Sequence, residues 1–380
     1  MAFCKKMKEF TDVKRFQDLI ESQPDFDAHE EVVFARDEQT GLQALIAVHN
    51  LSRGPGTGGT RLWRYDQFEN ALTDVLRLSA GMTYKNAMAE LPFGGGKAVI
   101  LAPKEFKSTR AEFMQAFGRA VESLQGRYCT AEDVGTNCDD MAEIAKSTRH
   151  IFGLRETSGD PSPYTARGVL LGLQESVREA LGTDSLKDVR VLVQGVGHVG
   201  YHLCRLLYEK GANIIVSDVN ETALARCEHE FGVDVVAPDR IFKTAIDVYA
   251  PCALGATVNE RSIAQMKCGV IAGAANNQLE SNETAELLRQ ADILYAPDYV
   301  INAGGIINIA CEVSQSYNAK IATQKVDEIQ GRVREIFARA KAENKTTLAV
   351  AGEMARERFQ TGQSSSFRVE DLTRTAARMA

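Results

Sequence analysis

Two lysines twelve residues apart, Lys85 and Lys97, are the side chains of this sequence best suited to proton transfer. Lys97 follows three glycines and leads into the apolar run Ala98–Leu101, which predicts a buried strand. Because lysine normally stays in water, a lysine at the start of a buried strand is a candidate for chemistry. The glycines would let a small ligand approach the backbone closely. A second cation nearby disfavours a charged amine, so the arrangement points to a general base.

Further polar candidates follow predicted strands. Glu132 and Asp133 come directly after a strand that ends near Ala131, and Gly135 indicates a turn that would aim a carboxylate. Open α/β sheets keep their ligand sites at such strand ends. The competing interpretation is that both acids only cap a helix. Asn302 lies in a turn of small residues after another predicted strand, where both a ligand contact and a structural Asx-turn fit.

A glycine-rich turn after a strand predicts the cofactor site. The strand Val191–Gln194 leads into Gly195-Val196-Gly197-His198-Val199-Gly200, a GxGxxG pattern that opens a helix. The first glycine makes the bend, the second lets a pyrophosphate approach, and the third lets helix and strand pack closely. Asp218 ends the next strand, where an acid accepts hydrogen bonds from ribose hydroxyls and repels a 2′-phosphate. The pattern predicts a dinucleotide, favours NAD over NADP, and places His198 at the helix start rather than in catalysis.

The order of the predicted elements indicates an α/β protein. Residues 1–160 mix strands and helices and are expected to form a domain for substrate binding and oligomerisation. Strands and helices alternate across 161–345, which predicts a doubly wound, Rossmann-type sheet that binds NAD. Residues 346–380 are expected to form a C-terminal helix and a mobile tail, with the C-terminal helices packing back across the cleft. The predicted linker is 158–163, in which Pro163 would keep the preceding serine out of helical geometry.

Apolar periodicity and turn residues locate the individual elements. The predicted strands span 31–35, 43–48, 189–194, 213–218, 233–237, 246–250, 269–274 and 293–296, and the predicted helices span 66–80, 111–125, 164–181, 198–210, 221–231, 259–266, 283–291 and 347–359, with a long amphipathic helix after about residue 315.

Composition and charge exclude several classes of protein. A net charge of −7 argues against a nucleic-acid partner, and no apolar run is long enough to span a membrane. Residues 1–9 lack the apolar core of a signal peptide. The eight cysteines are scattered without a CxxC pair or a Cys/His cluster, which predicts reduced thiols in the cytoplasm and no metal site. Cys129, beside the candidate acids, is interpreted as a small buried side chain.

Several ordered motifs give the chain a close resemblance to a known family. They are Gly54-Pro55 to Arg61, Met82 to Asn86, Leu91 to Lys97, Thr130 to Thr136, the glycine fingerprint, Ala274 to Leu279 and Pro297 to Gly305. From about residue 30 to about residue 360 the sequence resembles the glutamate/leucine/phenylalanine/valine dehydrogenase family, most of all its leucine and valine members. The resemblance implies reversible oxidative deamination of an L-amino acid to its 2-oxo acid and ammonium, with NAD reduced. It also implies a homo-oligomer.

The resemblance further implies roles for individual residues. Lys85 binds the substrate carboxylate, Lys97 is the general base that activates water, and Asp133 moves protons to and from the amino group. Asn302 holds the substrate and the nicotinamide end of the site. Other residues of the matching motifs are expected to contact the substrate (Thr57, Gly59, Met82 and Ala131) and the cofactor (Thr165, Ala274 and Asn276, with Gly195 to Gly200 and Asp218).

Three stretches bear on which amino acid is used. Glutamate-specific relatives carry a lysine where this chain has Thr57, so the side-chain carboxylate of glutamate would be buried without a partner. The branched-chain and aromatic members usually have leucine there. Thr130–Asp133 and Gly305–Ala310 resemble the leucine and valine enzymes, which favours a branched-chain substrate. The small Thr57 could also make room for a ring, so an aromatic substrate is the alternative.

Two other functions compete with this interpretation. A 2-hydroxy acid dehydrogenase would need a histidine base and an arginine for the carboxylate, and His198 is the histidine within the candidate stretches. An NAD-binding protein without catalysis would not need the set formed by Lys85, Lys97 and Asp133. The sequence therefore favours the amino acid dehydrogenase.

Overall fold

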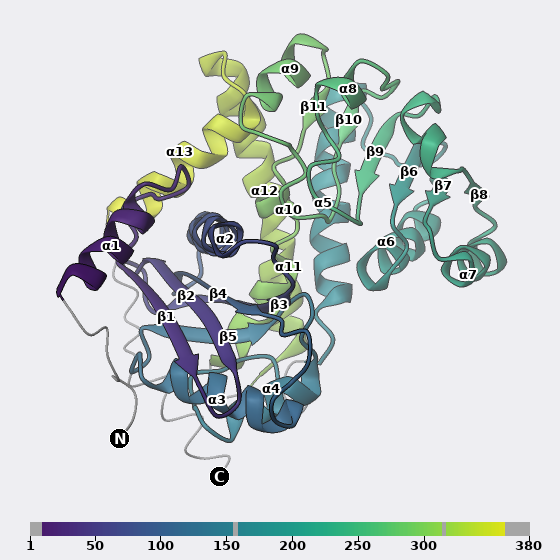
Figure 1. The fold of residues 1–380 in the computed structure, drawn as a ribbon. Helices are drawn as coiled ribbons and strands as arrows, with labels where there is room; N and C mark the ends of the chain where they lie inside the picture. Colours follow the sequence, from purple (N-terminus) through teal and green to yellow (C-terminus); the bar gives the residue numbers. More distant parts are fainter. Residues whose placement is uncertain (1–9, 155–158, 314–316, 362–380) are drawn as a thin grey trace. The chain divides into compact units, whose positions relative to one another are not determined.

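The computed structural model describes residues 10–154, 159–313 and 317–361. The described chain forms two compact units (Figure 1). The first comprises the described residues up to Ala87, together with 92–154 and 359–361, and the second comprises 88–91 and 159–358. The division into functional domains at residues 1–160, 161–345 and 346–380 stays a prediction. The tail after Gly362 and the first nine residues lie outside the described chain.

The first unit is built on a mixed sheet whose strands are β1 (Glu31–Asp37), β2 (Leu42–Asn50), β3 (Gly56–Trp63), β4 (Gly94–Leu101) and β5 (Tyr128–Glu132). Their order in the sheet is β1-β2-β4-β3-β5. β1 pairs antiparallel with β2, and β2 pairs antiparallel with β4. β3 is parallel to β4 on one side and to β5 on the other, so these three strands end at the same edge.

The helices of this unit are α1 (Phe10–Glu21), α2 (Phe68–Met88), α3 (Arg110–Glu122) and α4 (Cys138–Ala145). They cover both faces of the sheet (Figure 1). α2 packs on one face, where Val99 and Leu45 are buried against it, and α3 and α4 pack on the other, where Ala98 and Ile100 are buried. Because side chains alternate along a strand, Lys97 lies on the face of Val99, the side of α2.

The second unit is built on a parallel sheet whose strands are β6 (Arg190–Gln194), β7 (Asn213–Ser217), β8 (Asp234–Val235), β9 (Val248–Pro251), β10 (Val270–Ile271) and β11 (Leu294–Tyr295). Their order is β11-β10-β9-β6-β7-β8. The chain thus runs outward from β6 through β7 and β8, then returns to β9 and builds the other half. This is the doubly wound, Rossmann-type topology expected from the sequence. Sheets of this topology generally bind ligands where the strand order reverses, which here is at the ends of β6 and β9.

The helices after residue 160 are α5 (Ser162–Leu181), α6 (His198–Glu209), α7 (Glu221–Phe231), α8 (Glu260–Ile263), α9 (Thr284–Gln290), α10 (Asp298–Ile301), α11 (Gly304–Ala310), α12 (Ala319–Glu343) and α13 (Thr347–Gln360). The long helices α5 and α12 pack against each other. Two ion pairs join them: Arg167 Nε lies 2.5 Å from Asp327 Oδ1, and Arg334 Nη2 lies 2.7 Å from Glu175 Oε1.

Several local predictions differ from the structure. The glycine-rich stretches 54–59 and 94–96, which the sequence pattern assigns to no element, contribute most of their residues to β3 and β4. α2 continues to Met88, so Lys85 lies on a helix. Helix α5 begins at Ser162, before the predicted start at residue 164, and includes Pro163. A proline in the first turn of a helix costs no hydrogen bond, so it does not prevent this earlier start. α4 is not predicted at all, and Asn302 follows the short helix α10 rather than a strand.

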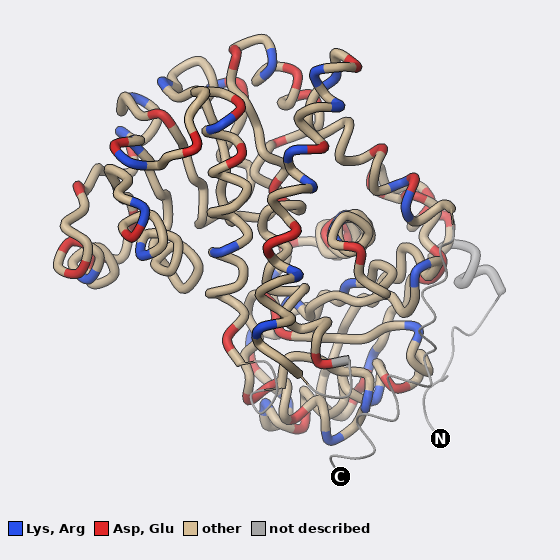
Figure 2. The backbone as a smooth tube through the Cα atoms, turned by 180° about the vertical axis from the view of Figure 1, so that it is seen from behind, with Lys and Arg blue, Asp and Glu red and all other residues tan. Residues whose placement is uncertain are grey.

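Acidic and basic residues are interspersed along the chain (Figure 2). Many of them form local ion pairs, such as Arg339 of α12 with Glu343 and with Glu357 of α13. Exposed pairs of this kind add little stability, so they describe a solvated surface. Among the described residues, no helix combines the length and apolar character that crossing a membrane requires.

Candidate active site

Lys97 and Asp133 form the central ion pair of the first unit. Lys97 lies within β4, and Asp133 follows β5 directly, with β3 between the two strands. Lys97 Nζ is 2.7 Å from Asp133 Oδ2, and the two side chains are 8% and 20% exposed. An ammonium and a carboxylate in direct contact and largely out of water can exchange a proton. The structure therefore brings together two side chains capable of acid–base chemistry.

Arg61 of β3 approaches the same carboxylate. Its Nε lies 3.5 Å from Asp133 Oδ2, and its Nη1 lies 2.8 Å from Oδ2 of Asp74 on α2. Burial alone would raise the pKa of Asp133, but Lys97 and then Arg61 outweigh burial and hold that pKa below its usual range. Sequence reasoning missed Arg61 as a site residue, although its two-residue spacing from Gly59 puts both on one face of β3.

Lys85 and Met82 lie one turn apart on α2, the helix that covers the face of the sheet on which Lys97 lies. Both are half-buried. From the sequence, Lys97 is expected to have a cationic neighbour, whereas in the structure its partner is an anion, Asp133. Lys97 is therefore one half of an ion pair, and it could act as a base only after its proton has moved away. The contact with Asp133 supplies a path for that proton.

The glycines beside Lys97 allow close packing. A Cβ on Gly95 would collide with Thr83 of α2, and a Cβ on Gly96 would lie 2.7 Å from the ring of Tyr128. A Cβ on Gly59 would lie 2.8 Å from the Cβ of Asp133. The expectation that this glycine run leaves open space for a ligand is therefore wrong. Its physical role is to let β3, β4 and α2 approach until Lys97 meets Asp133.

Thr57 and Ala131 are buried side chains on the central strands. Thr57 is fully buried on β3, and its hydroxyl donates to the Pro55 carbonyl over 3.2 Å. Ala131 pairs with Gly59 across β5 and β3, next to the pair formed by Cys129 and Thr57. Burial raises the pKa of the Cys129 thiol to about 12, so Cys129 is a small protonated side chain, as interpreted from the sequence. The Thr57 position offers no charge and its donor is already used.

The glycine fingerprint of the second unit has the geometry that a pyrophosphate needs. Gly195 turns with φ +91°, and Gly200 packs on the Gly195 carbonyl so closely that a Cβ would collide. A Cβ on Gly197 would meet nothing within 4 Å. Gly197 also begins α6 without a side-chain cap, so the first N–H groups of the helix remain available to an anion. The residues of this turn, including His198, Val196 and Val199, fit a dinucleotide.

Asp218 is aimed at this turn. Its Oδ2 accepts a hydrogen bond from the Val196 N–H over 2.7 Å, and its Oδ1 accepts one from the Asn220 N–H over 2.9 Å. Val219 and Leu254, which follow β7 and β9, are 90% and 76% exposed. Exposed apolar side chains at the ligand-binding edge of a doubly wound sheet suit the flat face of a base. Sequence reasoning missed both, because exposure at a strand end leaves no periodic signal.

Asn302 is held beside the loop after β10. Its Nδ2 donates to the Ala274 carbonyl over 3.1 Å and to Asn276 Oδ1 over 3.0 Å. The Asn302 Oδ1 is buried and accepts no hydrogen bond from the described residues, so it is an acceptor aimed at something else. Gln278 fixes the loop from beneath by donating to two of its carbonyls. Thr165 of α5 packs against Gly305, which follows Asn302 by three residues. A Cβ on Gly305 would lie 2.8 Å from the Thr165 hydroxyl.

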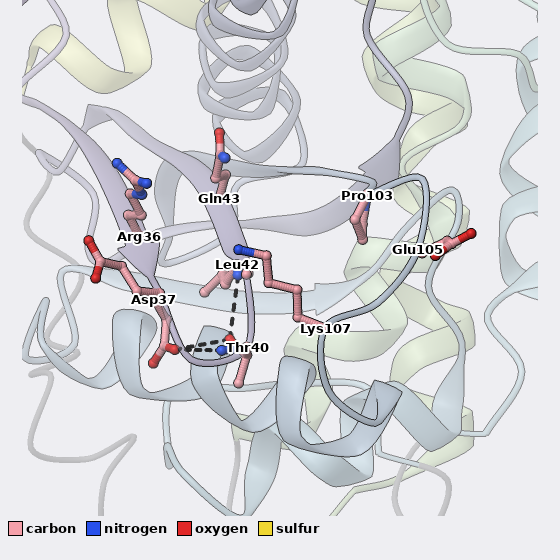
Figure 3. A pocket seen from close by; sticks show the side chains of 10 residues that line it. Arg36, Asp37, Thr40, Leu42, Gln43, Pro103, Glu105 and Lys107 are labelled. Atoms are coloured by element: carbon pink, nitrogen blue, oxygen red, sulfur yellow. Dashed lines mark hydrogen bonds between the residues drawn. The ribbon is translucent and has the colours of Figure 1, made fainter.

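A surface pocket lies away from these groups. Arg36, Asp37, Thr40 and Lys107 line it at the β1–β2 turn, and its volume is about 550 Å³ (Figure 3). The Thr40 N–H donates to Asp37 Oδ1 over 2.9 Å, which fixes the turn. Its polar lining includes none of the expected site residues. Over the described residues, no cluster of three or more His, Cys, Asp or Glu side chains is arranged to hold a metal ion.

The doubly wound sheet, the glycine turn and the acidic end of β7 define the class of the protein as an α/β protein with a Rossmann-type dinucleotide-binding fold. Comparison with known proteins narrows the class. The family described as "Glu/Leu/Phe/Val dehydrogenase, dimerisation domain" matches residues 29–150, and "Glutamate/Leucine/Phenylalanine/Valine dehydrogenase" matches residues 158–225 and 216–360. The chain belongs to this glutamate/leucine/phenylalanine/valine dehydrogenase family.

Individual relatives cover most of the chain. Leucine dehydrogenase of Geobacillus stearothermophilus is 47% identical over 336 residues, which are 88% of this chain and 91% of the relative. Phenylalanine dehydrogenase of Thermoactinomyces intermedius is 42% identical over 338 residues, 87% of this chain and 92% of the relative. The crystal structure of L-tryptophan dehydrogenase from Nostoc punctiforme matches with a TM-score of 0.77 and 38% identity, covering 93% of this chain and 100% of that one. The resemblance drawn from the motifs is confirmed.

Proposed function

We propose that the chain is an NAD-dependent L-amino acid dehydrogenase that converts an apolar amino acid, leucine or valine in preference, to its 2-oxo acid and ammonium. The observation that carries this proposal is the contact of Lys97 with Asp133 in a largely buried site. A protein that only binds a dinucleotide has no use for such an acid–base pair. Family membership makes the 2-hydroxy acid dehydrogenase alternative untenable, and the chain is an enzyme that acts on a CH–NH2 group.

The residues of the first unit have separate tasks. Lys85, Met82, Gly59 and Ala131 line the place where the amino acid lies, and the Lys85 ammonium pairs with its carboxylate. The bound nicotinamide would accept the hydride from the substrate Cα. Water then adds to the resulting substrate iminium carbon, and Lys97 takes a proton from that water.

Asp133 takes part in proton transfers both early and late in this reaction. It relays the proton that Lys97 must lose before acting as a base, after which it is ionised again, and later it passes a proton to the departing amino group. Its negative charge also stabilises the cationic iminium of the substrate. Because the carboxylate touches the Lys97 ammonium directly, these transfers need no intervening side chain.

Thr57 supports an apolar substrate. Its hydroxyl is tied to the Pro55 carbonyl, so it offers no positive charge to the side chain of glutamate. A carboxylate placed there would be buried without a counter-ion, at a cost of several kcal/mol. Leucine dehydrogenase is also the name of several relatives that are 45–47% identical to this chain. Phenylalanine or another aromatic amino acid is the second candidate, because relatives of 41–42% identity carry such names.

The second unit holds the cofactor in this proposal. Gly195 to Gly200 take the pyrophosphate, and Asp218 takes the ribose hydroxyls of NAD and disfavours a 2′-phosphate. Asn302 offers its free Oδ1 to the nicotinamide carboxamide or to the substrate, with Ala274 and Asn276 holding it in place. Thr165 completes this side of the site. We further propose a homo-oligomer located in the cytoplasm.

The test is an assay of NADH release with leucine, valine, isoleucine, phenylalanine, tryptophan and glutamate, repeated with NADP. The expected result is the highest kcat/KM with leucine or valine and NAD. Thr57→Lys is the informative variant and Thr57→Leu its matched control: the lysine should admit glutamate, whereas the leucine should leave glutamate inert. Preference of the unmodified enzyme for glutamate would overturn the substrate assignment, and absence of turnover with every amino acid would overturn the function.

A further inference from the structure

Arg61 lies in the site without a task in the proposed reaction. Its side chain is 22% exposed, between the carboxylate of Asp133 on one side and the carboxylate of Asp74 on the other. The separations are 3.5 Å to Asp133 Oδ2 and 2.8 Å to Asp74 Oδ2. Together with Lys97, these residues form a row in which positive and negative charges alternate.

The two cations beside Asp133 differ in one respect. Lys97 must lose and regain its proton during turnover, whereas an arginine guanidinium stays charged at every pH of interest. When Lys97 is neutral, the Asp133 carboxylate would lose its counter-ion in a largely buried site, and a carboxylate in that position takes up a proton. A permanent cation on the other side makes this uptake transient, so Asp133 passes the proton on and is ionised again.

We propose that Arg61 is a positioning residue that fixes Asp133 in place and restores its ionised form after Asp133 relays the proton of Lys97. The inference rests on the proposed function, because it concerns the same acid–base pair. Arg61 is part of the sequence motif Gly58-Gly59-Thr60-Arg61, but the motif by itself gives no reason for an arginine at this position.

Asp74 and Tyr65 lock Arg61 from behind. The Tyr65 hydroxyl donates to Asp74 Oδ2 over 2.5 Å, the same oxygen that accepts from Arg61 Nη1. The guanidinium is thus oriented by α2 on one side and presents its Nε to Asp133 on the other. Arg61 is thus held by a hydrogen bond to Asp74, whereas its Nε meets Asp133 as a charge at 3.5 Å without a hydrogen bond. An arginine anchored in this way can position a carboxylate, whereas a free arginine would follow it.

The charged and titratable groups around Asp133 come from each strand packed against it. Lys97 of β4 and Arg61 of β3 are the cations. Tyr128 of β5 is buried, burial raises its pKa, and its hydroxyl donates to the Gly58 carbonyl, so it stays neutral. Asp74 of α2 lies behind Arg61. Removing the charge of Arg61 therefore leaves the lysine–aspartate pair with one cation fewer. The negative charge of Asp74, which Arg61 otherwise neutralises, then also acts on the pair.

The experiment is the pH dependence of kcat for Arg61→Gln and Arg61→Lys, with the preferred amino acid and saturating NAD. Removing a positive charge a few ångströms from the lysine–aspartate pair favours the protonated form of the pair. The rise of kcat on the acidic side of the pH profile, its acidic limb, should therefore move to higher pH by about one unit in Arg61→Gln. Its kcat at the optimum should fall roughly tenfold while KM changes less than about twofold. Arg61→Lys keeps the charge, so its acidic limb should stay within about 0.3 pH unit of the parent enzyme.

Arg119→Gln is the matched control, because it removes an arginine–aspartate pair of the same unit whose arginine is 43% exposed. It should leave both limbs unchanged. A lowered kcat with an unmoved acidic limb in Arg61→Gln would overturn the inference, because a merely structural residue changes the amount of active enzyme and not its titration. If Arg61→Gln does not fold, Asp74→Asn decides: removing that anion should move the limb to lower pH, and an upward or absent shift contradicts the inference.

The outcomes separate the two proposals. If the parent enzyme turns over no amino acid, the proposed function fails. If the parent enzyme is active and Arg61→Gln retains its pH profile, only the role of Arg61 fails.

Discussion

Removing one partner of the Lys97–Asp133 pair should have unequal costs. In Lys97→Met the Asp133 carboxylate keeps Arg61 at 3.5 Å, whereas in Asp133→Asn the 8%-exposed Lys97 ammonium loses the anion that contacts it. Leaving a buried charge unpaired costs about 3–5 kcal/mol of unfolding free energy, and partial exposure reduces this. We therefore expect Asp133→Asn to lose about 3 kcal/mol and Lys97→Met about 1 kcal/mol.

The structure supplies a probe for this measurement. Trp63, the one tryptophan of the sequence, ends β3 in the first unit and is 54% exposed, so its fluorescence reports the unfolding of that unit in urea. Glu31→Gln is the control, because it removes the half-buried partner of the exposed Arg127 and should change stability by less than about 0.5 kcal/mol. If Lys97→Met is as costly as Asp133→Asn, Arg61 does not support the carboxylate. If neither variant shifts the transition, the buried ion pair is not formed.

Three further results are expected. Gly197→Val fills the open side of the fingerprint and should weaken NADH binding at least about 100-fold in a fluorescence titration without changing the urea midpoint, and an unchanged affinity would contradict the assignment of the pyrophosphate site. Asp218→Ser should raise the NADP to NAD ratio of kcat/KM at least about tenfold, and an unaltered ratio would remove Asp218 from cofactor selection. Burial, followed by the neighbouring His49, lowers the pKa of His29 from 6.5 to about 4. The unfolded chain therefore binds more protons between these values, so stability should be complete above about pH 6.5 and fall towards pH 4. His29→Gln should flatten this slope in urea midpoints measured across that range, and an equally steep slope would show that other groups cause it.

The sequence predicts most of the second unit, though not the short helices α10 and α11, because its signals are local. Each strand there is a short apolar run and each helix has apolar residues at helical spacing, so alternation alone predicts the doubly wound sheet. The GxGxxG turn is likewise a local signal, because it consists of six consecutive residues. The edges are less predictable: the segments 233–237 and 269–274 shorten to β8 (Asp234–Val235) and β10 (Val270–Ile271), because pairing with a neighbouring strand decides where a strand ends.

The first unit depends on distant contacts that sequence patterns do not carry. β3 contains Gly56, Gly58 and Gly59, residues of low strand propensity, and it exists because β4 and β5 pair with it on both sides. α4 is eight residues long and starts at the Asn137 cap, too short for a periodic signal. The meeting of Arg61 with Asp133 follows from the register of β3 with β5, which no spacing along the chain reveals.

The central claim is that the Lys97–Asp133 pair performs the proton transfers of amino acid deamination. The most direct measurement compares NADH release from L-leucine by the parent enzyme and by Lys97→Ala, with NADH affinity measured on both. We expect kcat to fall by about 10²–10⁴ in Lys97→Ala with NADH affinity unchanged, because the cofactor turn lies in the second unit. Turnover by Lys97→Ala within about threefold of the parent enzyme would show that another group is the base.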